Sequence, residues 1–479
     1  MLLIRGGTLV DAGGVRRGEI LIQGERIAAV GDRLDAPEAT ILDASGALVI
    51  PGAIDAHTHF DLPVGMVRSA DDFESGTIAA ACGGTTCVLD FAGAGQEPPD
   101  EALRAWHAKA RKRVAVDYGF HLTLTSIPDD PLEARRLFES FVRKGVTSVK
   151  LYLAYPERLM VDEATLSRAL RAGAETNVLV CVHAEDGHEI DRRAGEAIRT
   201  GGGVHPEELP ATRPPSVEAR AIRRAAEIAA EVGAALYIVH LSSRAGLEEA
   251  IDARRRGTRI FLETCPQYLV LTDEKLRQPA DDAANFVCAP PLRSDRDREA
   301  LWSSLASGAV AVVATDHCPF TLADRRRGTG GGDHWTNFTE IPGGLPGVET
   351  RLSLVYQGVR EGRLTLERWA DAVAGAPARV FGLSRKKGAL RAGLDADVVV
   401  FDPGARKRLD AGSLHMRTDH SPYEGMEVEG WPALTVSRGR IVARQGAPGD
   451  IQAGWGTFIP RRPFDPDTAR NGPERATGP

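Results

Sequence analysis

Apolar and polar residues alternate over short stretches at both ends of the chain. Near the start, LLIRGGTLV is followed by GEILIQGERIAAVG, in which the Gly24-Glu25 pair stands where a hairpin would turn. A similar alternation returns in DADVVVFDP (395–403) and in ALTVSRGRIVARQG (433–446). The pattern predicts that residues 1–50 and 385–455 fold together into one small β-sandwich.

The middle of the chain has a longer rhythm, in which apolar, β-branched runs alternate with stretches of helical character. The runs lie at 47–60, 85–93, 116–124, 146–155, 178–185, 235–243, 258–266 and 310–320. Eight strand–helix units in about 270 residues match the size of a (β/α)8 barrel. We therefore predict an α/β protein with a TIM-type barrel as the catalytic domain over 51–384. Residues 456–479, rich in Pro, Arg and Gly, are expected to form a C-terminal surface arm.

Composition narrows the class of protein. The 479 residues are 43% hydrophobic and 26% charged, which is typical of a globular enzyme. A net charge of −7 gives no electrostatic reason to expect nucleic acid or an anionic membrane as a partner. No apolar run approaches the ~20 residues of a membrane helix. The six cysteines show no CxxC pairing, which favours buried, reduced thiols in a cytoplasmic protein.

Candidate metal ligands occur where the predicted barrel strands end. His57 and His59 are two residues apart, so on an extended strand both imidazoles project to the same side. Further candidates stand at the ends of later runs, at Lys150, His183, His240 and Asp316. Because active sites of such barrels lie at the carboxyl ends of the strands, the sequence predicts that these six side chains converge on a metal centre.

Lys150 is the unusual member of this set, because divalent cations would repel its ammonium group. One interpretation is a lysine that reaches out to a partner carboxylate. The other is that the neutral amine, favoured by burial and nearby positive charge, has reacted with carbon dioxide. The resulting N6-carboxylysine would be an anion with two oxygens that could bridge two metal ions. Together with Asp316 and a hydroxide, it would offset three of the four positive charges.

The motifs around these residues resemble the hydantoinase/dihydropyrimidinase branch of the amidohydrolase superfamily. They are AIDAHTHF, DDFESGT, GGTT, KLYLAY, VHAEDG, VHLSS, ETCPQYL, APPLR, TDHCPF, IPGGLPGVETRL, SPYEGMEVEGWP and SRGRIV, in this order from about residue 2 to about residue 460. The resemblance implies a metal-dependent cyclic amidohydrolase, which opens a 5-substituted hydantoin or dihydropyrimidine ring to an N-carbamoyl amino acid. It also implies two zinc ions and a homotetramer.

The resemblance also implies a role for each site residue. The more buried ion would be held by four ligands and the second by three, with carboxylated Lys150 shared: His57, His59, Lys150 and Asp316 for the first, and Lys150, His183 and His240 for the second. Asp316 would carry a proton from the attacking hydroxide to the departing nitrogen. Tyr155, in KLYLAY, would support the oxyanion through its hydroxyl.

Substrate contacts are implied at three further places. Ala289 stands where the family usually has the serine of SPPLR, and Gly343 where it has the asparagine of IPNG. In the family these positions meet the ureide edge of the substrate largely through main-chain atoms, so the contacts should survive both replacements. Which ring the enzyme prefers is then left open. Residues 62–73 resemble the family's gate loop, whose apolar inner face for the 5-substituent would be Val64, Met66 and Val67.

Three alternatives stay open. A dihydroorotase usually has an arginine after its HxH motif, whereas Phe60 and Asp61 follow His59 here. An allantoinase would have the same metal ligands. A non-catalytic scaffold, as in dihydropyrimidinase-related signalling proteins, would have lost metal ligands, and the complete set of six argues against it.

Overall fold

The computed structural model describes residues 1–95, 97–202, 205–328, 332, 334–449 and 454–467. At its centre is a sheet of parallel strands in the order β17-β16-β15-β14-β13-β12-β11-β8. The bounds are β8 (Ala53–Thr58), β11 (Thr85–Ala92), β12 (Asp117–Thr123), β13 (Ser148–Tyr152), β14 (Leu179–His183), β15 (Ala235–Ile238), β16 (Arg259–Thr264) and β17 (Val312–Val313). A parallel bridge from Thr58 to His317 joins the first strand to the segment after the last. The predicted (β/α)8 barrel is therefore confirmed.

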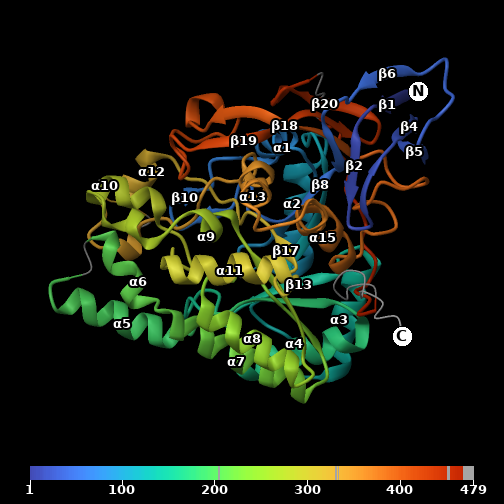
Figure 1. Cartoon of the computed structure of the whole chain (residues 1–479). Helices are drawn as coiled ribbons and strands as arrows, with labels where there is room; N and C mark the ends of the chain where they lie inside the picture. The colour runs from blue at the N-terminus through green and yellow to red at the C-terminus, as the bar shows by residue number, and fades with distance from the viewer. Residues whose placement is uncertain (96, 203–204, 329–331, 333, 450–453, 468–479) are drawn as a thin grey trace.

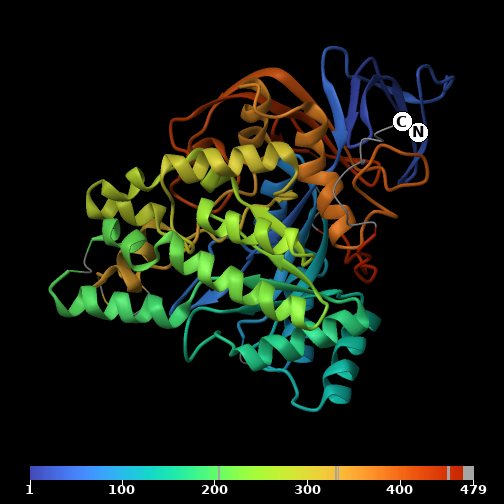
Figure 2. The same cartoon turned by 60° about the horizontal axis from the view of Figure 1, so that its bottom comes forward.

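Helices follow the strands and cover the outside of the barrel (Figure 2). The longer ones are α1 (Phe73–Cys82), α2 (Pro99–Ala110), α3 (Pro131–Arg143), α4 (Glu163–Thr176), α5 (Gly187–Arg199), α7 (Pro215–Glu231), α8 (Arg244–Arg255), α11 (Asp295–Ser307) and α13 (Arg351–Arg360). In α3, the Asp130 side chain caps the first turn, and Ala134, Phe138 and Phe141 form the buried face. Their spacing of four and three residues is that of an amphipathic helix packed on a core.

Both chain ends contribute to a β-sandwich beside the barrel, where Figure 1 shows the blue and the orange-red strands together. One sheet has the order β5-β4-β1-β6 and the other β21-β20-β19-β18-β7-β2-β3. The bounds are β1 (Leu2–Arg5), β2 (Thr8–Asp11), β3 (Gly14–Arg17), β4 (Glu19–Gln23), β5 (Arg26–Gly31), β6 (Thr40–Asp43), β7 (Leu48–Pro51), β18 (Val398–Arg408), β19 (Glu427–Ser437), β20 (Arg440–Arg444) and β21 (Ala447–Pro448). Gln23 pairs with Arg26 across the hairpin expected at Gly24-Glu25. The N-terminal β7 pairs antiparallel with the C-terminal β18.

The apolar run at 47–60 divides at Gly52 between the two domains. Before it, β7 lies in the sandwich, and after it, β8 begins the barrel. A Cβ on Gly52 would lie 2.2 Å from Thr86 Oγ1 and 2.9 Å from the Asp397 Cβ, so only glycine fits between the domains here. The exact domain boundaries at 50, 385 and 455 stay predictions.

The C-terminal segment differs from the expected surface arm. Ile459 and Phe464 are buried, and their backbone nitrogens bond to Tyr118 O and Asn177 O. These carbonyls lie at the starting ends of β12 and β14, so residues 454–464 cross the side of the barrel opposite the strand ends. The overall Pro, Arg and Gly content obscured the apolar residues that anchor this segment. Residues 468–479 of the expected arm lie outside the described residues.

A buried ionic cluster joins the barrel to the sandwich. Lys387 Nζ lies 2.8 Å from Asp117 Oδ2 on β12, pairs with Asp397 just before β18, and is 3.3 Å from Asp395 Oδ2. Arg438 also donates to Asp117 Oδ1 at 3.1 Å. Burial alone would lower the pKa of Lys387, but the carboxylates of Asp397 and Asp117 hold it well above its ordinary value. The lysine is therefore charged, and its positive charge stabilises the carboxylates that are buried with it.

Lys387→Ala should destabilise the protein by about 3–5 kcal/mol, because it leaves buried carboxylates without their ammonium partner. The free energy of unfolding in urea measures the effect. Arg385→Ala is the matched control, since it removes one positive charge from an exposed residue two positions away. Equal unfolding midpoints for the two variants would show that the cluster does not couple the domains.

Candidate active site

The six predicted metal ligands line one cavity of about 620 Å³ at the carboxyl ends of the barrel strands. His57 lies near the end of β8 and His59 follows it, while His183 is the last residue of β14. The others come from β13 and from the segments after β15 and β17, and are Lys150, His240 and Asp316. His240 and Asp316 have φ values of +39° and +53°. Such backbone angles are costly for non-glycine residues, and they turn these side chains inward where the strands stop.

Three ligand atoms converge at the first position. His57 Nε2 lies 3.2 Å from His59 Nε2, and Asp316 Oδ1 lies 3.0 and 3.1 Å from these two nitrogens. Zinc bound at about 2.0–2.1 Å places neighbouring ligand atoms roughly 3–3.5 Å apart. The distances between the three side chains therefore fit a shared divalent ion.

A second pair of ring nitrogens lies beside the first. His183 Nδ1 is 2.9 Å from His240 Nε2, and the ring centroids of His240 and His57 are 5.5 Å apart. Lys150 is buried, with its Nζ 4.9 Å from the centroid of the Phe91 ring. No ion pair among the described residues includes Lys150. The interpretation of Lys150 as a partner of a carboxylate therefore has no support within the described residues.

Two buried glutamates that the sequence analysis missed orient the histidines. Glu263 Oε1 lies 2.7 Å from His57 Nδ1, and Glu185 Oε2 lies 2.8 Å from His183 Nε2. Arg213 pairs with Glu185 in turn. With a proton on each glutamate-facing nitrogen, His57 Nε2 and His183 Nδ1 keep lone pairs directed at the centre. The donor set thus has the chemistry that divalent metals require, and the only sequence signal for the glutamates is an acidic residue in an apolar run.

Burial and charge set the protonation of the site. Burial tends to raise the pKa of Asp316, yet His57 and His59 hold it well below its ordinary value, so the carboxylate is ionised at neutral pH. Burial lowers the pKa of His59 to about 4. Burial also lowers the pKa of Lys150 to about 8, against the attraction of Asp316 and Glu263. More of the Lys150 amine is therefore neutral near neutral pH than for a lysine in water.

The model of the amidohydrolase family matches residues 48–442. The chain belongs to this family. A D-hydantoinase from Geobacillus stearothermophilus is 40% identical over 468 residues, which cover 96% of this chain and 97% of the relative. The solved D-hydantoinase from Bacillus sp. AR9 has a TM-score of 0.92 at 39% identity, covering 97% of this chain and 100% of that one. A dihydropyrimidinase from Brevibacillus agri has a TM-score of 0.92 at 37% identity, covering 97% and 99%.

This amidohydrolase is therefore an enzyme of the hydantoinase branch, which opens cyclic amides by hydrolysis. Membership of the family supports a binuclear divalent metal site, in agreement with the grouping of His57, His59 and Asp316. Within the described part of the chain, none of the helices combines the length and apolar character needed to cross a lipid bilayer.

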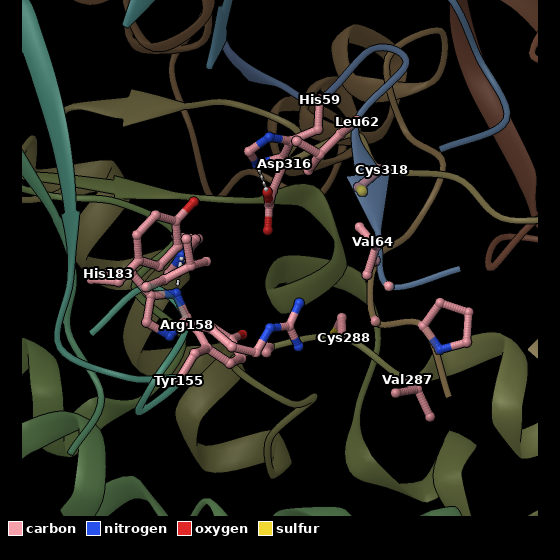
Figure 3. Close-up of a pocket in the computed structure, with 18 of the residues that line it drawn as sticks. His59, Leu62, Val64, Tyr155, Arg158, His183, Val287, Cys288, Asp316 and Cys318 are labelled. Atoms are coloured by element: carbon pink, nitrogen blue, oxygen red, sulfur yellow. Dashed lines mark hydrogen bonds and ion pairs between the residues drawn. The ribbon is translucent and has the colours of Figure 1, made fainter. Parts of the chain in front are cut away.

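Tyr155 lies on the wall of the amidohydrolase cavity that carries His183, with 5.4 Å between the two ring centroids (Figure 3). Its φ of +67° places it in the left-handed region, another costly backbone position among the site residues. Burial raises the pKa of Tyr155 to about 12, so its hydroxyl keeps its proton at neutral pH. The residue can therefore donate a hydrogen bond into the cavity.

Ala289 and Gly343 also line this cavity, together with Cys288 between Val287 and Ala289. A Cβ on Gly343 would meet its nearest atom, Cys288 Cα, only at 3.8 Å. Packing therefore does not require glycine here, and the missing side chain leaves space in the wall.

The expected gate loop forms a small hairpin from β9 (Pro63–Val64) and β10 (Val67–Arg68), in which Val67 pairs with Val64. Of the three residues expected on its inner face, only Val64 lines the cavity. Met66 is 77% exposed at the turn, and Val67 is buried against Cys318 and Phe320. The expectation was wrong for Met66 and Val67, because a two-residue turn directs Met66 outward and cross-strand pairing fixes the other two.

Proposed function

We propose that this amidohydrolase converts 5-substituted hydantoins or dihydropyrimidines to N-carbamoyl amino acids, with two zinc ions and carboxylated Lys150 at its centre. The proposal depends on one observation: two pairs of histidines converge in one cavity. His57 and His59 contact Asp316, His183 lies against His240, and Lys150 lines the same cavity. When bound, the two ions would polarise the ring carbonyl and supply hydroxide near neutral pH. The burial of Lys150 and its lowered pKa support the proposed carboxylation of its amine.

Asp316 is proposed to move the proton. Its Oδ1 faces His57 and His59, and Figure 3 shows its other carboxylate oxygen directed toward the open cavity. An amide nitrogen leaves poorly unless it is protonated. The free oxygen of Asp316 would hold the proton released by the attacking nucleophile and return it to the ring nitrogen as the C–N bond breaks.

Tyr155→Phe should lower kcat by about 10²–10³-fold, the cost of losing one oxyanion donor. The Tyr155 hydroxyl would bond to the carbonyl oxygen mainly as its charge develops, so KM should change much less. Metal content should equal that of the wild type, because Tyr155 is not among the ligands. Wild-type kcat in this variant would leave Tyr155 with a packing role alone.

The cavity wall supports the substrate class. Apolar side chains line the space beside the metal ligands, at Leu62, Val64, Leu159, Phe338 and Ile341. They favour a neutral ring that carries an apolar group next to the scissile carbonyl. After His59, where a dihydroorotase has an arginine, Phe60 is buried in the core. No arginine therefore follows His59 to pair with a carboxylate attached directly to the ring, and leaving such a carboxylate unpaired would be costly.

A substrate panel tests the proposal. We expect a 5-substituted hydantoin or dihydrouracil to give the highest kcat/KM, and dihydroorotate a value at least ~100-fold lower, a ratio that costs only a few kcal/mol. Highest activity on allantoin or dihydroorotate would reassign the substrate. Failure of the metal-loaded enzyme to open any of these rings would overturn the proposed reaction.

We further propose a homotetramer in the cytoplasm. The resemblance to hydantoinases supports the assembly, and six buried free cysteines support a reducing compartment. Light scattering of the purified protein tests the tetramer, since a monomeric mass at micromolar concentration would contradict it.

A further inference from the structure

A second arginine, besides Arg213, lines the catalytic cavity. Arg158 stands three residues after Tyr155, and Figure 3 places the two side by side on one wall. Arg213 is engaged with Glu185. Arg158, in contrast, is exposed and takes part in no ion pair among the described residues. The cavity therefore has a guanidinium whose donors are not used by carboxylates of this part of the protein.

The backbone that carries Arg158 is well fixed. The nitrogens of Arg158, Leu159 and Met160 all lie within 3.2 Å of Tyr155 O, and Tyr152 bridges to Met160. Burial raises the pKa of Tyr155, while the charges of Arg213 and Arg158 oppose the rise, as expected for cations close to the phenol. Arg158 thus lies on a fixed loop beside Tyr155, on a side chain long enough to meet a substituent.

Two other carboxylates, Glu97 and Asp191, line the same cavity. Glu97 accepts a hydrogen bond from Ala94 N at 2.8 Å, and Asp191 is exposed on α5. Neither forms an ion pair with Arg158. Asp191 is exposed, so solvent and salt weaken its repulsion of an anionic substituent. A guanidinium fork in direct contact with a carboxylate forms two charge-assisted hydrogen bonds, so this attraction should outweigh that repulsion.

Apolar side chains and a guanidinium line the same cavity, and together they indicate the chemistry of the ligand. Leu159 and Leu62 line the cavity with Arg158, so an apolar stem and a terminal anion would each find a matching surface. We propose that Arg158 selects substrates whose 5-substituent ends in a carboxylate on a short aliphatic stem, as in 5-(2-carboxyethyl)hydantoin. The inference rests on the proposed function, and it makes an N-carbamoyl acidic amino acid the preferred product. It concerns a carboxylate at the end of a stem, not one attached to the ring.

The test compares 5-(2-carboxyethyl)hydantoin with its neutral amide, 5-(2-carbamoylethyl)hydantoin, which has nearly the same shape. The wild-type enzyme should favour the acid by about 10-fold or more in kcat/KM, the scale of one charge-assisted hydrogen bond. Arg158→Gln should abolish this preference, mainly through the KM of the acid, because Arg158 meets the terminal carboxylate and not the reacting atoms. Arg158→Lys should restore part of it.

Glu157→Gln is the matched control, since Glu157 is the exposed neighbour of Arg158 and does not line the cavity. It should keep the wild-type ratio of acid to amide. If the wild type opens the amide but shows no preference for the acid, or if Arg158→Gln leaves the ratio unchanged, the inference is overturned while the proposed function stands. If the metal-loaded enzyme opens no 5-substituted hydantoin, the proposed function fails and the inference with it.

Discussion

Asp316→Asn should lower kcat on a neutral 5-substituted hydantoin by about 10²–10⁴-fold, the usual contribution of a general acid–base group. The amide keeps an oxygen that can face His57 and His59 but cannot take up and return a proton near neutral pH. In the wild type, the two histidines hold the pKa of Asp316 well below its ordinary value, so the side chain is an ionised carboxylate before the reaction. The rate should be measured together with metal content, because the substitution can also weaken one ion.

Asp191→Asn provides the control for this prediction. It makes the same change at an exposed carboxylate of the same cavity, and kcat on the neutral substrate should stay within about threefold of the wild type. A variant Asp316→Asn that retains its metal and turns over at the wild-type rate would remove Asp316 from the proton transfer.

Lys150→Ala should lose bound metal and ring opening together, because the proposed carbamate would supply one ligand to each proposed ion. The buried position leaves space where the side chain stood, so a short carboxylic acid such as acetate should restore part of the activity by supplying the missing oxygens. Mass spectrometry under native conditions or crystallographic density should show the added carboxylate on Lys150 in the wild type.

Lys144→Ala is the control, since exposed Lys144 pairs with Asp100 and does not line the cavity. It should keep both metal and activity. An unmodified Lys150 beside a fully occupied and active metal pair would refute the carbamate role.

The convergence of the six proposed ligands was predictable because two simple rules determine their place. Strand ends of a barrel meet at one face, and the two-residue spacing of His57 and His59 places both rings on one side of an extended strand. The residues that orient them follow no local rule. Glu263 meets His57 across 206 positions of sequence, and its role depends on the closure of the barrel, which brings β16 close to β8. Arg158 was missed for a similar reason, since only the folded loop after Tyr155 shows which side chains line the cavity.

The sequence-based predictions that were wrong concern the direction in which a side chain points. Val64, Met66 and Val67 are all apolar, and the sequence does not state that a hairpin turn separates Met66 from the cavity. Likewise, the composition of residues 456–479 suggested exposure, while Ile459 and Phe464 supply the contacts that hold the first part of this segment against the barrel. Average composition predicts poorly when a few apolar residues decide the packing.

The central claim is ring opening by a paired metal centre, and the most direct test measures metal content and hydantoin hydrolysis on the same samples. Purified enzyme should contain about two divalent ions per chain. Chelation should abolish hydrolysis, and zinc, manganese or cobalt should restore it as the content returns to about two. Full hydrolysis by protein that has been thoroughly freed of metal would contradict the account.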